Sequence, residues 1–155
     1  MWDVLLSLPG EAGASGQAIV EKLLGEQGIV VAIEMDLEAT AWMGDHPAGG
    51  RVIPVVGDAS EEAGPLSGWV NNATVFRDVS LHSAPTREVL DLVTLNLCCA
   101  VVGCVVVGCA VVGCATAVRR FLGAGKGGAS VSVSSHQTQR AVPGALPYVT
   151  VKAAT

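Results

Sequence analysis

The order of apolar and polar positions along the chain predicts strands that alternate with helices. Short runs of β-branched residues, each ended by polar or turn residues, are typical of buried strands. Such runs occur at 4–8, 29–36, 51–58, 68–73 and 129–135. Between the first two runs, Ile19 and Leu23 lie on one face of a predicted helix, which Gly25 and Gly28 end.

Two further helices are predicted, a long one from about Pro85 and a final one from about Pro147. Strands that alternate with helices in this way build a parallel sheet with helices on both of its faces. The sequence therefore predicts an α/β fold, a Rossmann-like doubly wound parallel sheet of about five strands in three α/β/α layers.

The turn after the first predicted strand, over residues 9–16, is rich in glycine and leads into the first helix. Glycines allow a phosphate to approach the backbone, and the N-terminus of a helix offers it unpaired N–H groups. The next strand ends on two acids, Glu34 and Asp36, and a carboxylate there can accept hydrogen bonds from a ribose. In this context the glycine pattern indicates a dinucleotide-binding site.

Composition narrows the classes of function. The formal net charge is −5, whereas a nucleic-acid-binding protein needs a basic surface, so we expect no nucleic-acid partner. His46, His82 and His136 lack the spacing of metal ligands, and we expect no metal site. The first residues lack the basic start and long apolar run of a signal peptide. Together with the clustering of the cysteines, this predicts a cytoplasmic protein.

All five cysteines lie in one uncharged stretch, 98–114, that repeats a five-residue unit. The units are AVVGC at 100–104, VVVGC at 105–109 and AVVGC at 110–114. A period of five keeps neither to one face of a helix nor to one face of a strand. We interpret the stretch as a tandem duplication that adds ten residues inside a core helix. The alternative is a membrane span over 97–118, a length that can cross a bilayer.

Several short motifs occur in the order in which the short-chain dehydrogenase/reductase family has them, and the sequence resembles that family from about Val4 to its last residue. PGEAGASGQAI at 9–19 is similar to the glycine-rich turn TGxxxGxG, GDAS at 57–60 to the segment that meets the adenine, and NNAT at 71–74 to the motif NNAG. TLNL at 94–97, SVSS at 132–135 and YVTVK at 148–152 resemble the active-site segments of the family.

This resemblance implies which residues carry the function. It places the cofactor at Gly10, Ala14, Ser15, Gly16, Glu34, Asp58, Asn72, Ala73, Tyr148 and Lys152, and catalysis at Asn96, Ser135, Tyr148 and Lys152. It implies hydride transfer between a nicotinamide cofactor and an alcohol or carbonyl substrate, with NAD favoured over NADP by the acid at Glu34. It also implies one NAD(P)-binding domain over residues 1–155, incomplete at its C-terminus because the family continues beyond this helix.

The spacing of two of these residues supports the same chemistry. Tyr148 and Lys152 are four residues apart and therefore share one face of a helix. An ammonium beside a phenol stabilises the phenolate, so the tyrosine can act as a general acid or base. Lys152 is three residues from the last residue of a short predicted helix. Because short helices fray, we expect the activity of this chain to be very low or absent.

Three functional hypotheses stay open at this point. The first is an NAD-dependent oxidoreductase that acts on a small alcohol or carbonyl substrate. The second is a non-catalytic Rossmann-like remnant or interaction module, and the third is a single-span membrane protein through residues 97–118. We expect no membrane partner under the first two, and a homo-oligomer is compatible with them. The fifth predicted strand would form an open edge of the sheet, which is a site of pairing with other chains.

Overall fold

The computed structural model describes residues 3–7, 13–33, 38–55, 66–72, 76–98, 110–140 and 142–154. Its strands form one sheet in the order β3-β2-β1-β4-β5. Their bounds are Asp3–Ser7 for β1, Ile29–Ile33 for β2, Val52–Val55 for β3, Gly68–Asn71 for β4 and Ala129–Ser132 for β5. All neighbouring strands are parallel, which confirms the predicted α/β fold with a five-stranded, doubly wound sheet.

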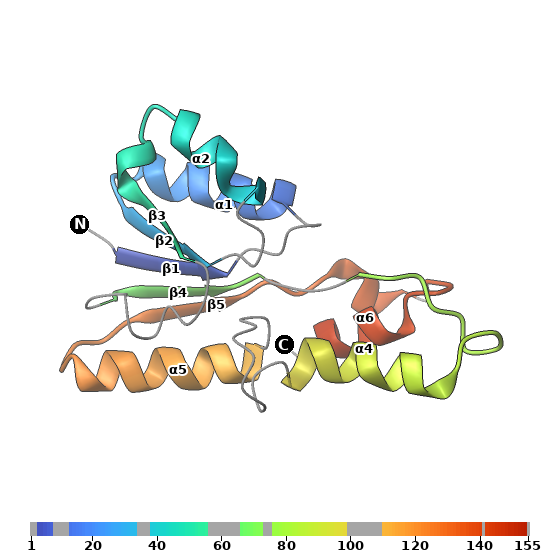
Figure 1. Cartoon of the computed structure of the whole chain (residues 1–155). Helices are drawn as coiled ribbons and strands as arrows, with labels where there is room; N and C mark the ends of the chain where they lie inside the picture. The colour runs from blue at the N-terminus through green and yellow to red at the C-terminus, as the bar shows by residue number, and fades with distance from the viewer. Residues whose placement is uncertain are drawn as a thin grey trace.

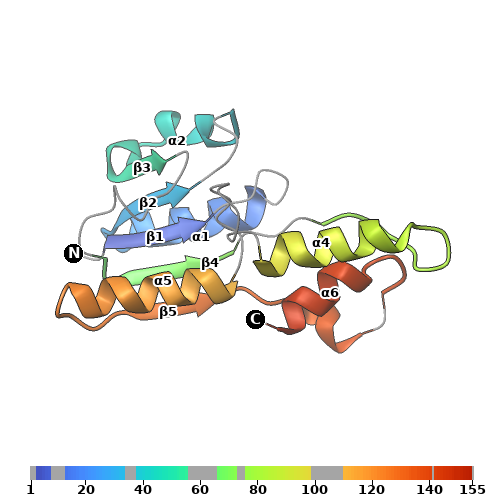
Figure 2. The same ribbon diagram turned by 60° about the horizontal axis from the view of Figure 1, so that its bottom comes forward.

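Helices cover both faces of this sheet, so the predicted three layers are also confirmed (Figure 1). The helices α1 (Gly13–Gly25) and α2 (Ala41–Asp45) lie on one face, and α5 (Ala110–Gly123) lies on the other. Figures 1 and 2 show α4 (Thr86–Cys98) and α6 (Leu146–Ala153) beyond the carboxyl ends of the strands. Three short 3₁₀ helices complete the described elements: η2 (Glu38–Thr40), η3 (Gly49–Arg51) and η4 (His136–Gln139).

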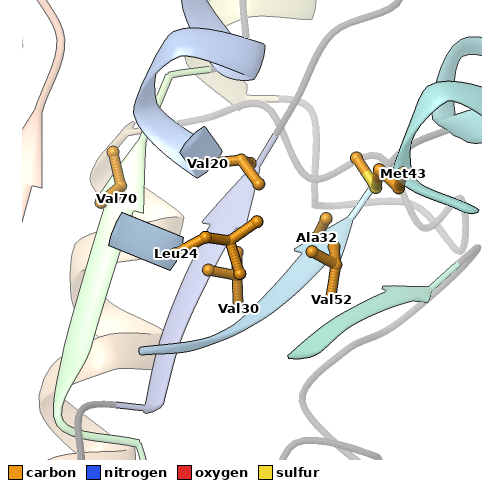
Figure 3. Packing of buried hydrophobic residues seen from close by; sticks show 7 residues of the cluster. All are labelled: Val20, Leu24, Val30, Ala32, Met43, Val52 and Val70. Atoms are coloured by element: carbon orange, nitrogen blue, oxygen red, sulfur yellow. The ribbon is translucent and has the colours of Figure 1, made fainter. Parts of the chain in front are cut away.

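The strand β2 is buried on both faces, which explains its uninterrupted apolar sequence. Alternate residues of a strand point to opposite faces of a sheet. Val30 and Ala32 accordingly belong to the cluster that packs under α1 and α2, together with Val20, Leu24, Met43, Val52 and Val70 (Figure 3). Val31 and Ile33 belong to the cluster under α5, together with Val55, Leu66, Trp69, Ala117 and Phe121.

The turn from α5 to β5 requires a glycine at one position. A Cβ atom on Gly128 would overlap the ring of Phe121, which is 8% exposed. The close approach of the backbone to this ring lets the chain turn back under the helix and enter the edge of the sheet. Burial of one such aromatic side chain contributes about 2–3 kcal/mol to folding.

The helix α1 ends at Gly25, one of the two glycines predicted to end it. The residue with the left-handed backbone conformation is Gln27, with φ of 62°, and not a glycine. The Gly28 N–H donates to the Leu23 carbonyl and the Gln27 N–H to the Leu24 carbonyl, both at 3.1 Å. This hydrogen-bond pattern is a Schellman motif, which stops the helix whichever residue occupies the left-handed position. On the buried side of α1, Val20 is more deeply buried than the predicted Ile19.

The strand β5 is shorter than the predicted range 129–135. It ends at Ser132, and the Val133 N–H makes one more bond to the Asn71 carbonyl at 2.8 Å. The shortening has a local cause, since the Ser135 side chain accepts a hydrogen bond from the Gln137 N–H and begins η4. The predicted strand residues 34–36 and 56–58 lie outside the described residues.

The helices α4 and α5 lie end to end, on either side of residues 99–109 (Figures 1 and 2). The third repeat unit, 110–114, forms the first turns of α5. The first two units lie outside the described residues, so the interpretation of the repeat as an insertion in a core helix stays a prediction. None of the helices in the described part of the chain is both long enough and apolar enough to cross a membrane.

Candidate active site

The strand order reverses between β1 and β4, and the carboxyl ends of these two strands mark the expected ligand-binding crevice. From β1 the chain builds outward through β2 and β3 on one side, and β4 and β5 extend the sheet on the other. In open α/β sheets, ligands bind at the point where the strand order reverses in this way. Asn72 directly follows β4 at this point and is 3% exposed.

The Asn72 side chain has a buried amide nitrogen without a partner in the described part of the chain. Its Nδ2 atom is buried and makes no hydrogen bond among the residues that the structure describes. A buried N–H group without an acceptor costs about 1–3 kcal/mol. Such a donor at the ligand-binding end of a parallel sheet is suited to a bound acceptor, such as an oxygen of a cofactor.

Lys152 brings a buried ammonium group to the same place. The residue is 4% exposed, and its Nζ atom donates to the Val133 carbonyl at 2.6 Å and to the Asn72 carbonyl at 3.5 Å. Burial lowers the pKa of the Lys152 ammonium. In return, the Ser134 hydroxyl donates to the Lys152 carbonyl at 2.6 Å, so the last turn of α6 is tied to the end of β5.

Tyr148 lies one turn before Lys152 on α6 and is half-buried. Its ring meets the ring of Phe76 edge to face, with the two centroids 5.1 Å apart. This arrangement is favoured by the quadrupoles of the two rings and restrains the direction in which the phenol points. Phe76 was not predicted, although it is one of only six aromatic residues and follows the end of β4 closely.

Ser135 lies three residues past β5 and is half-buried. Its Oγ atom accepts a hydrogen bond from the Gln137 N–H at 3.2 Å, and its carbonyl accepts one from the Thr138 hydroxyl at 2.7 Å. The first of these bonds uses a lone pair of the hydroxyl oxygen and not its proton. The hydroxyl of Ser135 therefore keeps a proton that it can donate to the oxygen of a substrate.

Asn96 is buried on α4, the helix that packs against α6. Its Nδ2 atom donates to the Leu92 carbonyl of the preceding turn at 2.9 Å. This bond fixes the plane of the side-chain amide. The packing of α4 against α6 brings three of the predicted catalytic residues, Asn96, Tyr148 and Lys152, onto two adjoining helices.

The predicted phosphate-binding turn is described in part. Strand β1 ends at Ser7 and helix α1 begins at Gly13, so the N-terminus of a helix follows the first strand closely in the chain, as a dinucleotide site requires. In its first turn Ala14 and Ser15 are exposed and Gly16 is buried. Gly10, Glu34, Asp58 and Ala73 lie outside the described residues. Among the described side chains, no group of three or more His, Cys, Asp or Glu residues could hold a metal ion.

Comparison with known proteins decides the family. The sequence model of the family described as "short chain dehydrogenase" matches residues 10–155. The chain belongs to this family. No curated protein sequence is a match for the chain.

Solved structures of short-chain dehydrogenases share the fold. An oxidoreductase of this family from Burkholderia thailandensis is 24% identical, with a TM-score of 0.72, over 99% of this chain and 59% of its own. Another short chain dehydrogenase/reductase family protein is 19% identical, with a TM-score of 0.73, over 99% and 63%. A 4-hydroxyisoleucine dehydrogenase complexed with NADH is 16% identical, with a TM-score of 0.71, over 99% and 63%. The chain thus spans about three fifths of the length of these structures.

Proposed function

We propose that this member of the short-chain dehydrogenase family binds NAD(H) at the carboxyl edge of its sheet and interconverts a small alcohol and its carbonyl compound. The observation that carries the proposal is the buried Lys152 ammonium, held by carbonyls at the ends of β4 and β5. Beside it lies the Asn72 amide nitrogen, which has no partner among the described residues. Burial of an ammonium is costly. Its position where parallel strands end supports a role in ligand binding over a role in the core.

The residues in this crevice fit a dinucleotide. The N-terminus of α1, with Ala14, Ser15 and Gly16 in its first turn, would hold the pyrophosphate. The amide of Asn72 and the ammonium of Lys152 would donate to the nicotinamide half of the cofactor. When bound, the cofactor supplies the position that gives or takes the hydride. Glu34, directly after β2, favours NAD over NADP because its carboxylate repels a 2′-phosphate.

Tyr148 and Ser135 act on the oxygen of the substrate. The hydroxyl of Ser135 donates a hydrogen bond to this oxygen and holds it in place. Tyr148 takes the hydroxyl proton of an alcohol during oxidation and returns it to the carbonyl oxygen during reduction. Lys152, one turn away on the same helix face, stabilises the phenolate of Tyr148, and Asn96 positions the proton path from the neighbouring helix.

Titration of the protein with NADH, followed by fluorescence, tests the cofactor site. We expect saturable binding in the micromolar range. Lys152→Met should weaken it about tenfold, since a hydrogen bond from a charged donor contributes about 1.5 kcal/mol or more. Lys22→Met is the matched control, because the Lys22 side chain is 79% exposed on α1 and should leave binding unchanged. Absence of saturable binding, or equal affinities of the two variants, would overturn the cofactor assignment.

Transfer of deuterium from a C-deuterated secondary alcohol to NAD, detected by mass spectrometry, tests the chemistry even when turnover is slow. We expect labelled NADH with the parent chain and none with Tyr148→Phe. The Tyr148→Phe variant should keep the fold of the parent, checked by circular dichroism, because the hydroxyl of Tyr148 makes no hydrogen bond among the described residues. Equal labelling by the two proteins would show that Tyr148 is not the acid–base group.

A further inference from the structure

Three contacts join the residues that follow β4 to α6 and to the loop before this helix. In order along the chain, the pairs are Asn72 O with Lys152 Nζ at 3.5 Å, the rings of Phe76 and Tyr148 with centroids 5.1 Å apart, and Val79 N with Gly144 O at 2.8 Å. Steps of four and three residues on one side face steps of four and four on the other. The two stretches therefore run side by side in opposite directions, and the first contacts both site residues of α6.

The contact at Val79 is anchored in a buried cluster. Val79 is 4% exposed and packs with Val89 and Leu92 of α4. The backbone at Gly144 comes close to this stretch, because a Cβ atom there would lie 3.3 Å from an oxygen of the Asp78 carboxylate. Gly144 also has a φ of 76°, which residues with a side chain rarely adopt. The stretch that carries Phe76 is thus held against the start of α6 by backbone contacts as well as by its ring.

The contact at Phe76 bears on the direction of the Tyr148 phenol. The phenol oxygen lies on the axis of the Cβ–Cγ bond, so the χ1 rotamer decides where this oxygen points. On a helix, two values of χ1 are common for an aromatic residue. The ring of Phe76 is inclined at 81° to the ring of Tyr148. Aromatic pairs prefer this edge-to-face arrangement, so the contact favours one of the two rotamers over the other.

We propose that Phe76 is a positioning residue for the acid–base step, and that its ring holds Tyr148 in the rotamer that directs the phenol oxygen at the oxygen of the substrate. The proposal rests on the function proposed above, in which Tyr148 exchanges a proton with that oxygen. Phe76 touches neither the cofactor nor the reacting atoms in this role and acts through Tyr148. The stretch after β4 then orients both site residues of α6, Lys152 through the Asn72 carbonyl and Tyr148 through the Phe76 ring.

Loss of the ring should slow proton transfer and leave the binding of substrate nearly unchanged. A general acid or base must lie within hydrogen-bond distance of the proton that it moves, and a misplacement of about 1 Å can cost about a hundredfold in rate. Without the Phe76 ring, Tyr148 divides its time between rotamers. If it keeps the productive rotamer for about one tenth of the time, the rate falls about tenfold.

The rate of deuterium transfer from 2-propanol deuterated at C2 to NAD tests the role in catalysis. Phe76→Leu keeps an apolar side chain without the ring, and we expect it to lower the rate at saturating alcohol about tenfold. The alcohol concentration that gives half of this rate should change less than about twofold, because Phe76 acts through Tyr148. Phe76→Tyr keeps the ring and should retain the parent rate. Leu81→Ala, 65% exposed in the same stretch, is the control and should also retain it.

Nuclear magnetic resonance tests the positioning without any turnover. Tyr148 is the only tyrosine of the chain, so isotope-labelled tyrosine reports this residue alone. Three-bond couplings across the Cα–Cβ bond should show one χ1 rotamer in the parent and an average of rotamers in Phe76→Leu, with the fold of both checked by circular dichroism. Equal couplings in the two proteins, or equal rates of deuterium transfer by them, would overturn the positioning role. A parent chain that transfers no deuterium would instead overturn the proposed function, and the couplings would then decide the positioning role alone.

Discussion

Removal of the Asn71 side chain should destabilise the fold, because this buried amide joins several elements. It is 8% exposed, and its Oδ1 atom accepts a hydrogen bond from the Trp69 indole N–H at 2.7 Å. Its Nδ2 atom donates to the Cys114 sulfur at 3.3 Å and to the Ser132 hydroxyl at 3.4 Å. One amide therefore joins β4, β5 and α5 beneath the helix.

The cost of Asn71→Ala can be worked from these contacts. Trp69 is 3% exposed, so its indole N–H loses its partner without gaining water, at about 1–3 kcal/mol. The two longer bonds of Nδ2 add about 0.5 kcal/mol each. We expect a loss of about 3 kcal/mol in the free energy of unfolding, which lowers the Tm of a chain of this size by about 6–12 °C.

Urea denaturation followed by circular dichroism measures this loss, and a double-mutant cycle tests its cause. In a Trp69→Phe background the indole donor is already absent, so Asn71→Ala should cost about 1–2 kcal/mol less than in the parent chain. Ser134→Ala, which removes a hydrogen bond of the same sheet end without touching Trp69, is the control and should show no such coupling. Equal costs of Asn71→Ala in both backgrounds would refute the reasoning.

Four further outcomes are expected. Because burial lowers the pKa of the Lys152 ammonium below 10.5, the unfolded chain binds more protons in the window between the two pKa values. Stability should therefore rise with pH through that window, and urea denaturation of Lys152→Met from pH 7 to 10 should show a flatter rise. Gln27→Gly should add about 1 kcal/mol, measured by thermal unfolding, because glycine adopts the positive φ without strain. Glu34→Ala should reduce the preference for NADH over NADPH in paired titrations, and an unchanged preference would remove Glu34 from the cofactor site. Deletion of residues 100–109 leaves the same sequence as deletion of 105–114, because the first and third repeat units are identical. The deletion joins α4 to α5 through one repeat unit, and we expect it to raise the Tm.

The strands of the sheet could be predicted because each one is marked by residues that are adjacent in the sequence. Each strand is a short run of apolar or β-branched residues, and the run at β2 is buried on both faces as its composition implies. The end of β5 could not be predicted from alternation alone, because the Ser135 hydroxyl captures the Gln137 N–H and turns the chain into η4. A hydrogen bond from a side chain to the backbone competes with extension of the strand. It does not change the pattern of apolar residues, so the pattern does not predict where the strand ends.

The candidate site could be predicted where a motif has a fixed spacing. Tyr148 and Lys152 share a helix face because four residues make one turn, and the structure keeps them on α6. The partners of these residues depend on the fold. The carbonyl that holds Lys152 most closely belongs to Val133, and the ring that meets Tyr148 belongs to Phe76, far away in sequence. Backbone acceptors and ring contacts of this kind follow from the packing of α6 against α4 beyond the carboxyl ends of the strands, which no local pattern encodes.

The strand order has a consequence for how the protein opens. The pairing of β1 with β4 joins strands that are distant in the chain, whereas β1 to β3 follow one another. We expect transient local unfolding to separate the sheet at the pairing of β1 with β4. This pairing is a seam between two units that each unfold cooperatively. Asn72, and through it Lys152, lies at the end of this seam. A ligand in the crevice would therefore bridge both units and slow the hydrogen exchange of backbone amides in β1 and β4 more than in β3. Amide exchange can thus report occupancy of the crevice in an experiment that does not depend on turnover of a substrate.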